Sequence, residues 1–141
     1  MDELELIRTL ANLIDEDQRK NFVIFGSAAI KMNGVDLGRT IADFDVFVAE
    51  ETFATLATRF AASQKNGNDG IVPFYAPAEN IEILKSFPGV VFDDVAHGAG
   101  ITEVSFGFPV GNLDDLRKWK TAQGRDKDKV DIKRIDAYLS R

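Results

Sequence analysis

Two short stretches decide the fold: Val23-Ile24-Phe25-Gly26-Ser27-Ala28-Ala29 and, further on, Asp43-Phe44-Asp45. The first is an apolar run followed by small residues, which predicts a strand that turns directly into a short helix. The second belongs to another apolar run, which predicts a second buried strand. Together they join a close-packed turn to two carboxylates. This pairing suits a site that holds a phosphate at one end and a divalent cation at the other.

The two aspartates carry the metal hypothesis. On a strand, residues i and i+2 point to the same side, so Asp43 and Asp45 are expected to project together while Phe44 secures the core. Two neighbouring carboxylates repel each other unless a proton or a cation lies between them. Oxygen-only ligands favour Mg²⁺ or Mn²⁺. An isolated Asp-x-Asp is more often a solvated pair at a strand edge, so further residues must support the site.

Glu82 is the candidate third carboxylate. It lies between Ile81 and Ile83, so on a strand it points away from the apolar face. If that strand lies beside the strand with the two aspartates, three carboxylates converge and can activate a hydroxyl for attack on a phosphate. Glu103 has a similar setting and is the rival third ligand. The alternative for both is a surface glutamate on a half-exposed strand.

Residues suited to a phosphate occur at both ends of the chain. Gly26 allows a close backbone approach, and Ser27 follows it at the start of the predicted helix. Candidates elsewhere are Arg39, Thr40, Lys120 and the charged segment Arg125, Asp126, Lys127, Asp128. The alternatives are an ordinary strand-to-helix turn, a solvated loop arginine and a solvated connection between two helices. A P-loop motif is not found, so that class of enzyme is not supported.

Length and composition set the outer limits. The 141 residues suit one domain, 1–141, and the apolar fraction of 45% can fill a core. There is no cysteine, which excludes disulfides, thiolate metal sites and a cysteine nucleophile. The net charge of −6 argues against nucleic-acid binding over the general surface. No apolar run approaches the roughly 20 residues of a membrane helix, and the acidic start lacks a signal peptide, so we expect no membrane and a cytoplasmic setting.

The hydrophobic pattern predicts a mixture of helices and strands without strict alternation. We therefore expect an α/β or α+β domain with helices packed on a mixed β-sheet. The eleven Phe leave room for an apolar interface with a second copy or a partner protein. The expected helices are 3–15, 28–33, 51–63, 113–122 and 128–139. The expected strands are 22–25, 44–48, 71–75, 81–85 and 101–108, with loops at 35–41 and 64–70 and a loop around His97.

The order of these motifs resembles the minimal nucleotidyltransferases of the DNA polymerase β-like superfamily. Their pattern is an apolar strand, Gly-Ser or Gly-Gly, a helix, and Asp-x-Asp on the next strand. The variant that looks most similar is the AbiEii-type toxin group of bacteria and phages. Those proteins often carry Arg-Thr just before Asp-x-Asp. They also often end in a leucine-rich helix with a lysine, here Lys120, followed by a motif that reads Gly124-Arg125-Asp126-Lys127-Asp128-Lys129-Val130-Asp131.

The resemblance implies a reaction and a set of roles. The reaction would move NMP from an NTP to a hydroxyl acceptor with release of pyrophosphate. Asp43, Asp45 and Glu82 would bind Mg²⁺ or Mn²⁺, with Glu82 as general base or second-metal ligand. The nucleotide would contact Gly26, Ser27, Arg39, Thr40, Lys120, Arg125, Lys127 and Asp128. The acceptor stays open between an RNA end, a protein hydroxyl and a small molecule.

The chain departs from the family pattern at two points. The third acid is usually aspartate and here is Glu82, and the chain carries no large extra domain for a macromolecular acceptor. The alternative function is therefore a nucleotide-binding or interaction module of the same fold without turnover, from a toxin–antitoxin or phage-related system.

Overall fold

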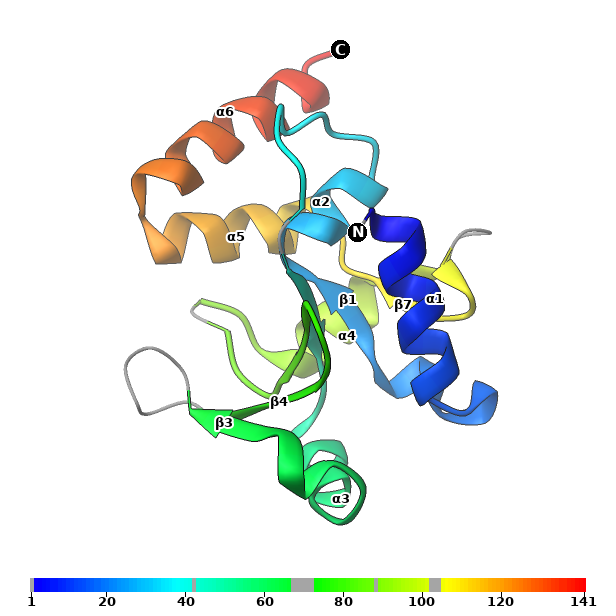
Figure 1. Ribbon diagram of the computed structural model, residues 1–141. Coiled ribbons are helices and arrows are strands. Elements are labelled where there is room, and N and C mark those ends of the chain that lie inside the picture. Colours follow the sequence, from blue (N-terminus) through cyan, green and yellow to red (C-terminus); the bar gives the residue numbers. More distant parts are fainter. Residues whose placement is uncertain (1, 42, 67–72, 88, 102–104) are drawn as a thin grey trace.

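The computed structural model describes residues 2–41, 43–66, 73–87, 89–101 and 105–141. Within these ranges the strands form one seven-stranded sheet in the order β3-β4-β5-β2-β1-β7-β6 (Figure 1). Their bounds are β1 Val23–Phe25, β2 Phe44–Phe47, β3 Gln64–Asn66, β4 Pro73–Ala78, β5 Ile81–Leu84, β6 Gly100–Ile101 and β7 Pro109–Val110. The central strand β2 is antiparallel to β1 and parallel to β5. The predicted mixed sheet is thus confirmed.

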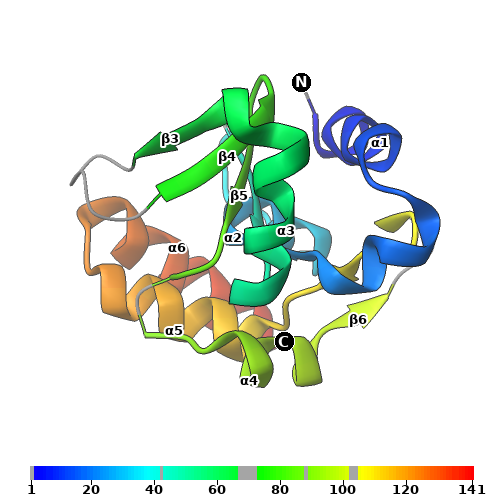
Figure 2. The ribbon, with the colours of Figure 1, turned by 90° about the horizontal axis from the view of Figure 1, so that it is seen from below.

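Helices cover both faces of this sheet. Figure 2 shows α1 and α3 on one side and α4 and α5 on the other, with α6 packed along α5. Their bounds are α1 Glu3–Leu13, α2 Gly26–Met32, α3 Glu50–Phe60, α4 Phe92–Gly98, α5 Leu113–Gln123 and α6 Asp126–Leu139, with short 3-10 turns at Glu16–Asn21 and Ala61–Ser63. No helix in the described ranges is long and apolar enough to cross a membrane.

Two helix starts are capped by a side chain. The Asp2 side chain accepts a hydrogen bond from the Glu5 backbone N–H at 2.8 Å, and Asn112 accepts one from Asp115 at 2.8 Å. Each bond satisfies one of the backbone donors that a helix start leaves without a partner. Gly124 ends α5 in the left-handed conformation, with φ 64°, as a C-terminal glycine does.

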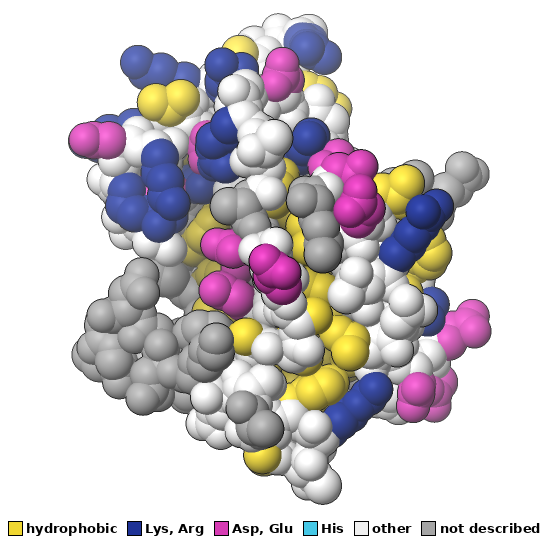
Figure 3. All heavy atoms as spheres, in the orientation of Figure 1, with side chains coloured by type: hydrophobic (Ala, Val, Ile, Leu, Met, Phe, Trp, Pro, Cys, Tyr) yellow, Lys and Arg dark blue, Asp and Glu magenta, His cyan; other side chains and the backbone are white. Residues whose placement is uncertain are grey.

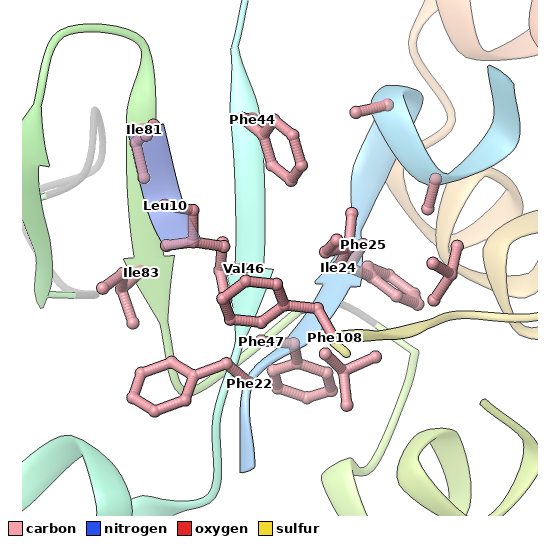
Figure 4. Packing of buried hydrophobic residues seen from close by; sticks show 14 of the residues in the cluster. Leu10, Phe22, Ile24, Phe25, Phe44, Val46, Phe47, Ile81, Ile83 and Phe108 are labelled. Atoms are coloured by element: carbon pink, nitrogen blue, oxygen red, sulfur yellow. The ribbon is translucent and has the colours of Figure 1, made fainter. Parts of the chain in front are cut away.

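Buried side chains pack on both faces of the sheet, and one face carries a cluster of four aromatic rings. Aliphatic side chains of the sheet face α1, with Leu10 lying among Ile24, Val46 and Ile83 (Figure 4). On the other face the rings of Phe25, Phe47, Phe87 and Trp119 form a cluster with centroid separations of 4.9–5.7 Å. These separations match the spacing at which aromatic pairs attract. This aromatic cluster includes Trp119 of α5 and therefore packs that helix against β1, with Phe47 of β2 in the same cluster.

The structure corrects several predicted elements. Helix α2 starts at Gly26, two residues earlier than expected, and α6 starts at Asp126. The predicted loop 64–70 begins with β3, which pairs with β4. The predicted loop around His97 is wrong, because His97 lies in the last turn of α4. The apolar runs there are short and glycines flank His97, so the sequence shows no helical pattern. The predicted strand 101–108 is confirmed only at its first residue, Ile101, which ends β6. Residues 102–104 lie outside the description, and residues 105–107 form a turn in which Gly107 has φ 85°.

Candidate active site

The register of three adjacent strands brings the site together. Glu82 on β5 is the direct partner of Asp45 on β2, and Asp45 is in turn the partner of Phe25, the last residue of β1. Because directly paired residues project to the same face of a sheet, the two carboxylates lie side by side. Gly26 and Ser27 follow Phe25 at once, so the phosphate candidates begin where the row of carboxylates ends.

The predicted pairing of Glu82 with the aspartate strand is therefore confirmed. The position of Glu82 next to the aspartates could not be predicted from its neighbours in the sequence, because strand order depends on long-range contacts. The rival, Glu103, lies outside the described residues.

Asp45 carries the electrostatic signature of the site. Burial raises its pKa from 3.8 to about 8, with further increases from the charges of Glu82 and Asp43 and from a hydrogen bond with the Glu82 side chain. The nearby Lys120 ammonium works in the opposite direction and lowers this pKa. Burial and the neighbouring acids therefore favour the protonated form of Asp45 in the metal-free chain. A cation would relieve the same repulsion that the proton relieves.

Asp43 is less well placed than Asp45. It lies just before β2 and is exposed, although its charge reaches Asp45. Within the described parts of the chain, no group of three or more His, Asp or Glu side chains is arranged so that it could hold a metal ion. Asp45 and Glu82 fit a hard cation as oxygen donors with a shared proton to release. A third ligand from Asp43 requires its side chain to turn toward them.

Gly26 allows the backbone to pass directly over the Asp45 carboxylate. A Cβ at this position would lie 2.5 Å from Asp45 Oδ2, and the residue has φ +69°, a conformation that L side chains rarely adopt. Both observations require glycine here. The close approach of the Gly-Ser turn to a phosphate stays a prediction; what the structure shows is that Gly26 packs against the Asp45 carboxylate.

Four side chains form a closed ring beside this turn, which we call the Ser27 ring. Ser27 Oγ lies 3.2 Å from Arg39 Nη2 and 3.4 Å from Lys120 Nζ. Both of these cations also bind Asp131 Oδ2, Arg39 at 2.6 Å and Lys120 at 2.8 Å. The ring joins α2, the loop before β2, α5 and α6. It places two positive charges around one hydroxyl.

Asp128 supports the ring from behind. It accepts hydrogen bonds from Lys120 Nζ at 3.1 Å, from Arg125 Nε at 2.6 Å and from the Arg125 backbone N–H at 3.1 Å. Burial raises the pKa of Asp128, but the bonds from Arg125 and Lys120 outweigh this and hold it below its usual value. With its oxygens engaged, Asp128 acts on Lys120 rather than toward a ligand.

Acidic and basic groups meet at this place on the molecular surface. In Figure 3, Asp and Glu side chains gather near the middle of the face, and Lys and Arg side chains gather above them over α5 and α6. The charge of Lys120 lowers the pKa of Asp45, so these two residues interact electrostatically. A ligand with both a metal-binding and an anionic part suits this junction.

Two of the predicted nucleotide-binding residues lie elsewhere. Thr40 is exposed and lines a separate hollow of about 400 Å³, whose other lining residues are Asp2, Glu3, Glu5, Lys31 and Ile41. Lys127 is exposed in the first turn of α6, outside the ring. Asp131 was not predicted as a site residue. Its spacing of three from Asp128 on a helix was the available signal, since such residues share a face.

Comparison with known proteins supports the fold. No family model and no curated protein matches the chain. Among solved structures it is similar to a crystal structure from Thermotoga maritima that is described as a candidate nucleotidyltransferase. The TM-score is 0.60 at 17% sequence identity, and the match covers 100% of this chain and 97% of the other. The chain therefore has a nucleotidyltransferase-like fold, as its motifs predicted.

Proposed function

We propose that this protein is a metal-dependent nucleotidyltransferase that moves NMP from an NTP to a hydroxyl acceptor and releases pyrophosphate. One observation carries the proposal above the others. The register of β5, β2 and β1 sets Glu82 beside Asp45 and places the Gly26-Ser27 turn at the end of that row. The carboxylates that suit a cation and the turn that suits a phosphate therefore lie at the same end of these three central strands.

The carboxylates form the reacting end in this proposal. Asp45 and Glu82, with Asp43 turned toward them, would hold Mg²⁺ or Mn²⁺. The metal would neutralise charge on the α-phosphate and lower the pKa of the attacking hydroxyl. The acceptor oxygen would form a bond to the α-phosphorus as the bond to pyrophosphate breaks. Glu82 would accept the hydroxyl proton, or, where it binds a second ion instead, that proton would pass to water. Positioning and electrostatics supply most of the rate.

The Ser27 ring forms the nucleotide end. Arg39 and Lys120 present positive charge on either side of Ser27, where charge-assisted hydrogen bonds to phosphate oxygens are strong. Arg125 is partly exposed above Asp128 and would add charge at the rim. These contacts hold the β- and γ-phosphates that leave as pyrophosphate.

The acceptor in this proposal is one of three classes: an RNA end, a protein hydroxyl or a small molecule. Placement within the AbiEii-type toxin group, and with it a toxin–antitoxin or phage setting, rests on the sequence likeness alone and belongs to this proposal. So does a cytoplasmic location.

Transfer of label tests the reaction. Purified protein is incubated with Mg²⁺, each of four α-labelled NTPs and a mixture of RNA and protein acceptors, and we expect label to appear on one acceptor class. Asp45→Ala and Glu82→Gln should abolish transfer. Glu79→Gln is the matched control, because Glu79 is an exposed acid just before β5. Transfer that survives Asp45→Ala contradicts the assigned mechanism.

A second candidate is a nucleotide-binding or interaction module without turnover. The exposed position of Asp43, outside any described three-acid group, is the observation that favours it. This module would show NTP-induced thermal stabilisation without label transfer. Absence of both signals contradicts the nucleotide hypothesis as a whole.

A further inference from the structure

The Ser27 ring poses an electrostatic problem that one residue solves. Arg39 and Lys120 carry like charges, yet both lie within 3.4 Å of the same Ser27 oxygen. Without a negative charge between them they would repel each other. Arg39 would then move into solvent, because 36% of its side chain is already exposed.

Asp131 supplies that negative charge from the far side. A single oxygen, Oδ2, binds Arg39 at 2.6 Å and Lys120 at 2.8 Å. Asp131 and Lys120 are each only 1% exposed, so this arrangement is fixed by packing. Asp131 binds these two cations, and none of the metal-binding, proton-transfer or phosphate-contact roles proposed above is assigned to its carboxylate.

The surrounding contacts confine the loop that carries Arg39 to α6. Arg134, one turn after Asp131, donates a hydrogen bond from Nη1 to the Asp36 backbone oxygen at 3.1 Å. Gly38 has φ +69°, and a Cβ there would lie 2.5 Å from Arg134 Nη2. The loop therefore rests closely on α6, and Asp131 sets the place where its arginine ends.

We propose that Asp131 is a positioning residue for polyphosphate binding: it holds Arg39 and Lys120 so that both point at the position of Ser27. The ligand class is a nucleoside triphosphate or its polyphosphate part, so the inference rests on the proposed function. Asp131 acts through the two cations and does not contact the ligand.

The sign of the charge effect makes this inference testable. If Asp131 only neutralised the cations, its removal would tighten binding of an anion. If it positions them, its removal weakens binding even though the site becomes more positive. Loss of one well-oriented charge-assisted bond corresponds to about a tenfold change in affinity.

The experiment measures binding of inorganic tripolyphosphate with Mg²⁺ by isothermal titration calorimetry, which needs neither acceptor nor turnover. We expect Asp131→Asn to weaken binding about tenfold. Asp131→Glu keeps the buried charge, and therefore the fold, but moves the carboxylate by one methylene, so it should also weaken binding. Asp136→Asn is the matched control, because Asp136 lies on the same helix and pairs with Arg117 at the surface, at 2.8 Å. Its affinity should equal that of the unchanged protein.

Each outcome has a meaning of its own. Binding by either Asp131 variant that equals or exceeds that of the unchanged protein overturns the positioning role and leaves the proposed function standing. Failure of the unchanged protein to bind tripolyphosphate overturns the proposed nucleotide site and the inference together. A weakened Asp136→Asn variant overturns the positioning role as well, because the loss would then be general to α6.

Discussion

At Gly26 the chain has no room for a single methyl group. Its missing Cβ leaves the space that Asp45 Oδ2 occupies, and its positive φ adds backbone strain to any replacement. We expect Gly26→Ala to push the Asp45 carboxylate away from Glu82 and to lower transfer by about two orders of magnitude, since small displacements of reacting groups have large effects on rate. Label transfer measures the effect. Gly100→Ala is the control, because no atom of the described residues lies within 4 Å of a Cβ there, and an equal loss in both variants contradicts the argument.

Asp45 makes the metal-free protein sensitive to pH. Its pKa is raised from 3.8 to about 8 in the folded chain, so the folded state keeps a proton that the unfolded state has lost. Stability from this group is therefore lost as the pH rises from the lower value to the upper one. Asn cannot ionise, so Asp45→Asn should raise the melting temperature in EDTA by several degrees, and by more at about pH 8 than at about pH 5. A gain that is equal at both pH values contradicts this pKa.

Among the elements, α6 depends on a buried acid at its start. Asp128 has no exposed surface, and it binds Lys120 and the side chain and backbone of Arg125. Removal of one partner of a buried ion pair leaves the other charge buried alone. Asp128→Asn should therefore lower the melting temperature at neutral pH by about 10 °C.

The pH dependence of this effect has the opposite sign to that of Asp45. The pKa of Asp128 is lowered in the folded chain, so its stabilisation is present above its ordinary value of 3.8 and is lost as the pH falls through the folded value. The difference between Asp128→Asn and the unchanged protein should therefore shrink in acid. Asp136→Asn, at an exposed pair with Arg117, should leave the melting temperature unchanged, and a matching drop there contradicts the role of burial.

Elements with a strong local signal were predictable from the sequence, and those built by distant contacts were not. The caps Asp2 and Asn112 and the helix end at Gly124 depend only on neighbouring residues, so their signals are present in the sequence. The strand β3 exists because β4 lies beside it, and its residues alone carry no strand pattern. Helix α4 holds seven residues, too few for a helical period to stand out.

The site divides in the same way. In the sequence, the alternation of acidic and apolar residues was enough to select Asp45 and Glu82 as candidates. That they lie side by side follows only from the parallel pairing of β2 with β5 in the structure. The part played by Asp131 could not be predicted, because an acidic residue on a charged helix usually faces water. Its burial follows from how α6 packs on α5 and over the loop before β2.

Over the whole molecule the charge is divided unequally. Residues 113–141 carry nine Lys and Arg against six Asp and Glu, whereas residues 1–112 carry eight against seventeen. The hairpin of α5 and α6 is therefore a positive region, of charge +3, on an acidic protein, and it attracts anionic ligands.

This field predicts a kinetic effect of an exposed lysine. Lys127→Gln on α6 should slow nucleotide association about twofold at low salt, and the difference should vanish at high salt, because exposed charges are screened. Stopped-flow fluorescence of Trp119, the single tryptophan, can follow binding, since the Lys120 ammonium lies 4.6 Å from the centre of its ring. Lys20→Gln, an exposed change far from α6 in the sequence, is the control and should leave the rate unchanged.

The Ser27 ring also has a consequence in time. Its bonds join residues 92 and 93 positions apart, from Arg39 to Asp131 and from Ser27 to Lys120. A ribosome adds about 5–20 residues each second, and the N-terminal part of a chain leaves it first. The strands with Asp45 and Glu82 are therefore made seconds before α6 exists. A growing chain can pair the strands that carry its carboxylates early, but it cannot close the Ser27 ring until α6 has left the ribosome.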